Sequence, residues 1–132
     1  MGWVREKFER ERTLDLGIPA AWCALRESIE RAGEEFQERH RDVSVTVSVV
    51  RSGLIYILVR RGSAEETLEV SLDSDARKVV ATARYPQPKH RLGFLLDADG
   101  DVSLTMGEKS ITAEQASRLL LEPLFFKDAS RN

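Results

Sequence analysis

An alternation of apolar and polar side chains begins at residue 43 and marks the start of a β-rich region. Valine occupies every second position from Val43 to Val49, and the residues between are serine or threonine. A period of two residues places the valines on one face of a strand and the polar side chains on the other. The segment therefore predicts a half-buried strand with one face toward water.

A second strand is predicted over residues 54–59, because Arg51-Ser52-Gly53 supplies a short turn between two extended segments. This strand, Leu-Ile-Tyr-Ile-Leu-Val, is apolar at every position, unlike the first. We expect it either to be central or to have its outer face covered. We expect the same of the apolar stretch Leu92–Leu96: it is central, or its outer face is covered.

Further segments alternate in the same way, and turns rich in glycine, aspartate, serine or proline separate them. Short turns between successive strands favour antiparallel neighbours. We therefore predict an antiparallel meander sheet of about six strands. The four segments that follow the first hairpin are 68–72, 79–85, 92–96 and 102–106.

A helical stripe of apolar residues precedes the strands. Its members recur at spacings of three and four, which predicts a helix that ends near His40. Gly33 lies inside this helix and marks either a bend or a close approach to the sheet. The stripe consists of Trp22, Leu25, Ile29, Ala32 and Phe36.

Residues 3–16 predict a strongly charged helix in which Trp3 and Phe8 are the large apolar side chains before Leu14. Gly17 ends or bends this helix. Pro19 suits the first turn of a following helix, where its missing N–H is not needed. The N-terminal region is therefore predicted as one helix or as two.

The C-terminal region predicts a helix that starts at a capping box. Thr112 is the N-cap, Gln115 follows three residues later, and Pro123 ends or kinks the helix. We expect this helix to pack on the same sheet face as the N-terminal helix. The fold class is then α+β, with one domain over residues 1–132.

Composition narrows the class of protein. The chain has 132 residues, 42% of them apolar and 32% charged, with a net charge of −2, which disfavours nucleic acid and anionic membranes as partners. Cys23 is the single cysteine, so an internal disulfide is excluded. Charges stand where a signal peptide would have its apolar core, and no apolar run could cross a bilayer. We expect a cytoplasmic protein.

The residues that could carry chemistry form no catalytic pattern. Acidic side chains at Asp97, Asp99, Asp101 and Glu108 have the spacing of calcium ligands, but Val102 stands where such a loop needs glycine. The strand-like flanks indicate a hairpin turn instead. Cys23, His40 and His90 are widely separated and match no nucleophile motif. We predict no catalytic residue, no metal ligand and no cofactor.

The sequence does not specify a biochemical function. The two-sided apolar strands favour a non-catalytic protein-binding or interaction module that self-associates as a homodimer through the outer sheet face. The candidate binding residues on that face are Tyr56, Leu58, Arg60, Tyr85 and Leu95.

Three alternatives remain open. The N-terminal helix, through Trp3 and Phe8, could cover the outer face itself. A small apolar ligand could occupy a pocket between sheet and helices. An enzyme with a cleft that joins His40 or His90 to carboxylates is the third. The side chains expected around an apolar pocket are Trp22, Phe36, Leu119 and Phe125.

Overall fold

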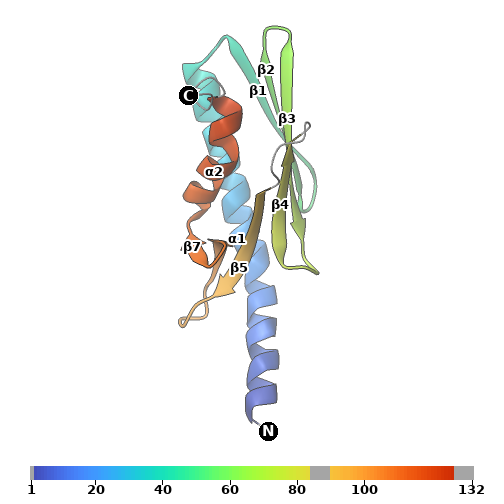
Figure 1. Ribbon diagram of the computed structural model, residues 1–132, viewed down its shortest axis with the longest axis vertical. Helices are drawn as coiled ribbons and strands as arrows, with labels where there is room; N and C mark the ends of the chain where they lie inside the picture. The colour runs from blue at the N-terminus through green and yellow to red at the C-terminus, as the bar shows by residue number, and fades with distance from the viewer. Residues whose placement is uncertain (1, 84–89, 127–132) are drawn as a thin grey trace.

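The computed structural model describes residues 2–83 and 90–126, which form a long helix, seven strands and a short helix (Figure 1). This arrangement confirms the α+β class and the helix–strands–helix order. The elements are α1 (Gly2–Arg39), β1 (Val43–Arg51), β2 (Leu54–Arg61), β3 (Ala64–Asp73), β4 (Lys78–Ala83), β5 (His90–Leu96), β6 (Val102–Met106), β7 (Lys109–Ile111) and α2 (Ala113–Phe125).

The sheet is the predicted antiparallel meander, with strands in the order β1-β2-β3-β4-β5-β6-β7. It has one strand more than predicted. The additional strand, β7, pairs with β6 across a tight turn in which Met106 faces Lys109 and Gly107 has a φ of 64°. Glycine is favoured in such a turn because it adopts positive φ without strain. Three residues are too few to reveal a period of two, so periodicity misses this strand.

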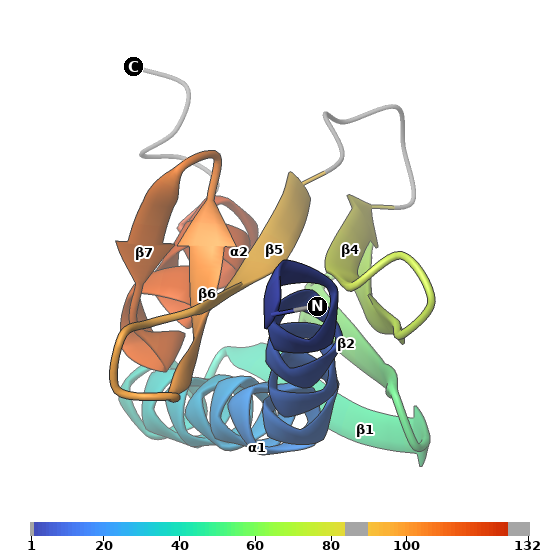
Figure 2. The same ribbon diagram turned by 90° about the horizontal axis from the view of Figure 1, so that it is seen from below.

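The N-terminal region is a single helix, so the alternative of two helices is wrong. Pro19 lies inside α1 and cannot donate a hydrogen bond to the Asp15 carbonyl. Buried Ile18 and Trp22 flank the proline and anchor the helix to the core on both sides of it. Figure 2 views the first part of α1 end-on while its later part runs across the picture, so the helix changes direction along its length.

The predicted stripe of α1 faces the core. Four stripe residues, Trp22, Leu25, Ile29 and Phe36, are buried, and Ala32 is half-buried. Ile18, outside the predicted stripe, is buried as well. Helix α1 contacts β1, β5, β6 and α2. Trp22, Leu25, Ile29 and Phe36 share one apolar cluster with buried side chains of the strands and of α2. The position of α2 on the same sheet face as α1 stays a prediction.

At Gly33 the helix α1 lies close to the sheet, which is one of the two predicted roles of this glycine. A Cβ atom added there would lie 2.9 Å from Cγ2 of Val47. One turn later, the Gln37 amide bonds the free edge of β1: its Nε2 donates to the Val43 carbonyl (2.6 Å), and its Oε1 accepts from the Val45 N–H (2.7 Å). The end of α1 thus satisfies backbone groups of an edge strand that would otherwise be open to pairing.

The predicted capping box of α2 is present. The Thr112 hydroxyl accepts from the Gln115 N–H (3.0 Å), and the Gln115 side chain accepts from the Thr112 N–H (2.9 Å). The helix passes through Pro123 and ends at Phe125, so the proline does not end it. Phe125 is buried and stacks on Phe36 of α1 with ring centroids 4.5 Å apart. These contacts attach the C-terminal end of α2 to α1.

Candidate interaction surface

Three of the predicted binding residues lie together on the outer face of β2. Tyr56, Leu58 and Arg60 alternate with the buried residues Ile55, Ile57 and Val59 and therefore point away from the core. Their cross-strand neighbours are mostly polar. Tyr56 lies between Ser48 and Glu69, Leu58 between Thr46 and Thr67, and Arg60 between Ser44 and Glu65.

This outer face is less apolar than the strand sequence indicates. Tyr56 and Leu58 are half-buried, because side chains of the neighbouring strands flank them. Arg60 is exposed, and its Nε lies 3.7 Å from Glu65 Oε2 across the β2–β3 hairpin. The apolar surface here is a line one strand wide, bordered by serine, threonine and charged groups.

The structure does not bring Leu95 together with these residues. Strand pairing places Leu95 on the outer face of β5, where its side chain is 46% exposed. However, β4 pairs with β5 only at Val79–Ala81, so Leu95 lies beyond the end of that pairing. Tyr85 lies outside the described residues.

The most exposed aromatic side chains of the described residues lie at the start of α1. All of residues 2–10, called here the helix tip, are exposed. Trp3 is 73% exposed and Phe8 is 68% exposed. In Figure 1 the dark-blue start of α1 extends past the strands. The alternative in which Trp3 and Phe8 cover the outer sheet face is therefore wrong.

The apolar residues of the helix tip continue the stripe that the body covers further along α1. Val4 and Trp22 are 18 residues apart, which is about five full turns, so both point the same way. Trp3 is similarly in phase with half-buried Leu14, about three turns later. Periodicity along residues 3–36 could have shown this continuity. It could not have shown where the sheet stops.

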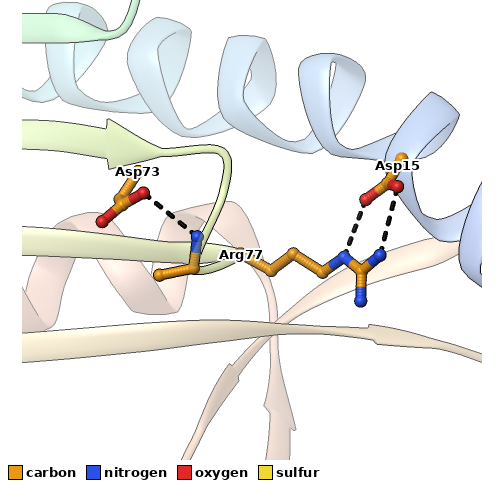
Figure 3. A network of polar contacts seen from close by, with 4 residues as sticks. Asp15, Asp73 and Arg77 are labelled. Carbon is orange, nitrogen blue, oxygen red and sulfur yellow. Dashed lines mark hydrogen bonds and ion pairs between the residues drawn. The ribbon is translucent and has the colours of Figure 1, made fainter.

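Two contacts hold the base of the helix tip against the body. Gly17 packs against β6, because a Cβ added there would lie 2.4 Å from Val102 Cγ2. On another side of the helix, Arg77 in the β3–β4 turn donates two hydrogen bonds to the Asp15 carboxylate, at 2.7 and 3.1 Å (Figure 3). In the same turn the Ala76 N–H donates to Asp73 (3.1 Å). The tip thus projects from a fixed base.

The Asp15–Arg77 pair should make stability depend on pH in the acid range. The hydrogen bonds from Arg77 are the main cause that lowers the pKa of Asp15 below its ordinary value. A lowered folded-state pKa adds stability above the unfolded-state pKa, about 4, and that stability is lost as pH falls through the folded-state value. We expect Asp15→Asn to be less stable than the unmodified protein at pH 7 and equally stable at pH 2, measured by urea unfolding. A difference that persists at pH 2 would contradict this.

The Asp97–Asp101 segment forms the predicted turn. The Asp97 carboxylate accepts hydrogen bonds from the backbone N–H groups of Asp99 (2.9 Å) and Asp101 (3.0 Å). Gly100 has a φ of 85°, which favours glycine. One carboxylate oxygen of this turn therefore has a structural role. Within residues 2–83 and 90–126, no group of histidine, cysteine and acidic side chains is arranged to hold a metal ion.

The other candidate groups lie in structural surroundings. Cys23 is a half-buried free thiol on α1. His40 follows the end of α1, 17 residues and roughly 25 Å along the helix from Cys23. It stacks on Phe36 with ring centroids 4.3 Å apart. His90 is paired with Ala81 in the sheet. The residues expected around an apolar pocket belong to the core: Trp22, Phe36 and Phe125 are buried in it, and Leu119 packs against it.

None of the helices in the described part of the chain is both long enough and apolar enough to span a membrane. Comparisons with protein-family models, with curated proteins and with solved structures find no match. Any functional proposal therefore rests on the surfaces of the molecule, among which the helix tip carries the two exposed aromatic residues Trp3 and Phe8.

Proposed function

We propose that the protein is a non-catalytic, cytoplasmic interaction module that self-associates, and that the helix tip is its binding surface. The exposure of Trp3 and Phe8 carries the proposal. Large aromatic side chains dominate the energetics of protein interfaces and are rarely left in water together. The helix tip also holds three basic and two acidic residues, so two copies meet with little net repulsion.

The expected complex is weak. Burying one large apolar side chain is worth about 1.5–3 kcal/mol. A symmetric dimer that buries Trp3 and Phe8 of both copies gains roughly 6–12 kcal/mol by the same measure. Association costs on the order of 4–15 kcal/mol. We therefore expect an equilibrium between monomer and dimer at micromolar or higher concentrations.

Sedimentation velocity over a range of concentrations tests this proposal. The unmodified protein should shift from monomer to dimer as concentration rises, and the variant Trp3→Ser/Phe8→Ser should stay monomeric. Leu16→Ser is the matched control. Leu16 is 71% exposed on the same helix, but it lies six residues before Trp22, about 120° around the axis from it and on the side away from the stripe. The Leu16→Ser variant should self-associate like the unmodified protein.

At concentrations where the unmodified protein is monomeric, the melting temperatures of all three proteins should agree, because none of the substituted side chains is buried. If the unmodified protein stays monomeric at every concentration, self-association is contradicted. A Trp3→Ser/Phe8→Ser variant that dimerises normally would assign the interface to another surface, such as the outer face at Tyr56 and Leu58, and would contradict the role of the helix tip.

A further inference from the structure

The open edge of β1 is a candidate binding surface that shares no residue with the helix tip. We infer that an extended, uncharged segment of another protein adds to this edge as a strand parallel to β1, beside residues 46–49. The inference goes beyond the proposed self-association and does not depend on it. It is carried by the lack of charge along β1, by the bonds that Gln37 makes there, and by the backbone groups that those bonds leave free.

The two edge strands of the sheet, β1 and β7, differ in their protection against pairing with another chain (Figure 2). β7 has three residues, and its Lys109 is exposed. Shortness and lysine both discourage an added strand. β1 has nine residues, and none of residues 43–50 is charged. Towards its end Val49 is 47% exposed and Val50 is 60% exposed, so this part of the edge lacks the usual protection.

The Gln37 amide bonds the edge of β1 as one residue of a parallel strand would. Such a residue donates its N–H to the carbonyl of residue i on the neighbouring strand and accepts from the N–H of residue i+2. Gln37 does the same with Val43 and Val45. Because the peptide groups of a strand alternate in direction, the next groups on this side are the Val45 carbonyl, both groups of Val47 and the Val49 N–H. These four groups match two further residues of a parallel strand, in line with Gln37.

A second copy of β1 does not fit these groups. Two hydrogen-bonded edge strands that are related by a two-fold axis run antiparallel. Antiparallel partners exchange both the N–H and the carbonyl of each bonded residue. Every such register at residues 45–49 uses the Val45 N–H, which Gln37 occupies, or the Val49 carbonyl, after which the pairing with β2 is irregular. The free groups therefore favour a segment of a different protein.

The side chains of β1 define the chemistry of this segment. Residues that lie side by side on neighbouring strands share a face of the sheet. The two residues that bond β1 lie beside Thr46 and Ser48, on the outer face, where small polar side chains fit. The residues that follow each of them lie beside Val47 and Val49, on the apolar face. The expected segment therefore alternates threonine or serine with valine or isoleucine.

Amide hydrogen exchange measured by NMR tests the inference with the peptide acetyl-Lys-Thr-Val-Thr-Val-Lys-amide, whose terminal lysines keep it soluble. At about ten times the dissociation constant, which a chemical-shift titration gives, about one copy in eleven is free, so exchange at Val47 and Val49 should slow about tenfold. The amides of Thr46 and Ser48 point towards β2 and should exchange at unchanged rates. A control peptide with proline in place of the second threonine lacks the N–H for the Val47 carbonyl and should cause no slowing.

A nitroxide attached to the C-terminal end of the peptide tests the orientation. In the parallel arrangement this end lies beyond Val49, near the β1–β2 turn. The label should therefore broaden the amide signal of Gly53 more than that of Val43. Stronger broadening at Val43 would overturn the parallel arrangement.

Equal slowing by the two peptides would contradict backbone pairing, and no slowing up to the solubility limit of the threonine–valine peptide would contradict strand addition altogether. The Trp3→Ser/Phe8→Ser variant should bind this peptide like the unmodified protein, because its β1 edge is intact. Loss of binding in that variant would place the peptide at the helix tip and overturn the inference. Peptide binding by a protein that sediments as a monomer at every concentration would support the inference while the proposed self-association fails.

Discussion

Gly17→Ala is expected to lower the free energy of unfolding by about 1–3 kcal/mol, the usual cost of forcing atoms into a packed site. Helix propensity alone predicts the opposite sign, because alanine is about 1 kcal/mol better than glycine inside a helix. Packing outweighs propensity here, since the new Cβ would lie 2.4 Å from Cγ2 and 2.9 Å from Cβ of Val102. Valine branches at Cβ and sits on β6, so it cannot rotate out of the way.

Urea unfolding of a double-mutant cycle measures this contact. Val102→Ala alone should cost some stability, and Gly17→Ala/Val102→Ala should be more stable than the two single losses predict when added. Gly2→Ala is the matched control on the same helix. Its Cβ would meet only a Glu6 side-chain oxygen, at 4.0 Å, so this variant should be as stable as the unmodified protein or slightly more stable. A stable Gly17→Ala protein would mean that α1 does not approach β6 this closely.

Arg61→Met is expected to lower the free energy of unfolding by about 2–3 kcal/mol, because hydrogen bonds from charged groups contribute more than neutral ones. Arg61 is half-buried at the end of β2, and its Nη2 donates to the Leu124 carbonyl (3.0 Å) and to the Phe125 carbonyl. The last carbonyls of a helix have no partner within the helix, and a positive charge near them is favourable. Arg61 therefore fastens the end of α2 to the sheet.

The adjacent residue supplies the matched control. Arg60 points to the opposite face of β2, and its exposed ion pair with Glu65 is worth no more than about 0.5 kcal/mol. Arg60→Met should therefore leave urea unfolding nearly unchanged. Amide hydrogen exchange in the last turn of α2 should be faster in Arg61→Met and unchanged in Arg60→Met. Equal unfolding curves for the two variants would contradict the role of Arg61.

Local patterns in the sequence determined most of the elements. The valine alternation in β1, the apolar stripe of α1 and the Thr112–Gln115 capping box each depend on neighbours within a few residues, so each can be read without the fold. The turn at Asp97–Asp101 is of the same kind. Short turns between consecutive strands then determined the antiparallel meander.

The surface on which the proposed function depends could be predicted only in part from the sequence. Sequence identified Trp3 and Phe8 as large apolar residues on a charged helix, but it could not show that nothing in the described structure covers them. It also overestimated the apolar character around Tyr56 and Leu58. Their burial depends on Thr46, Ser48, Thr67 and Glu69 from neighbouring strands, and cross-strand register is a long-range property.

Tertiary structure alone decided where α1 stops being a core helix and becomes a projecting one. The apolar positions of residues 3–36 share one side of the helix, and Lys7 and Glu11 interrupt them near the N-terminal end. The interruption does not show at which residue the body stops covering this side. The helix continues through Gly17 and Pro19 because Val102 packs on one side, Arg77 bonds Asp15 on another, and Ile18 and Trp22 reach the core. Periodicity determines which side of a helix is apolar. Only the length and placement of the sheet determine how much of that side is buried.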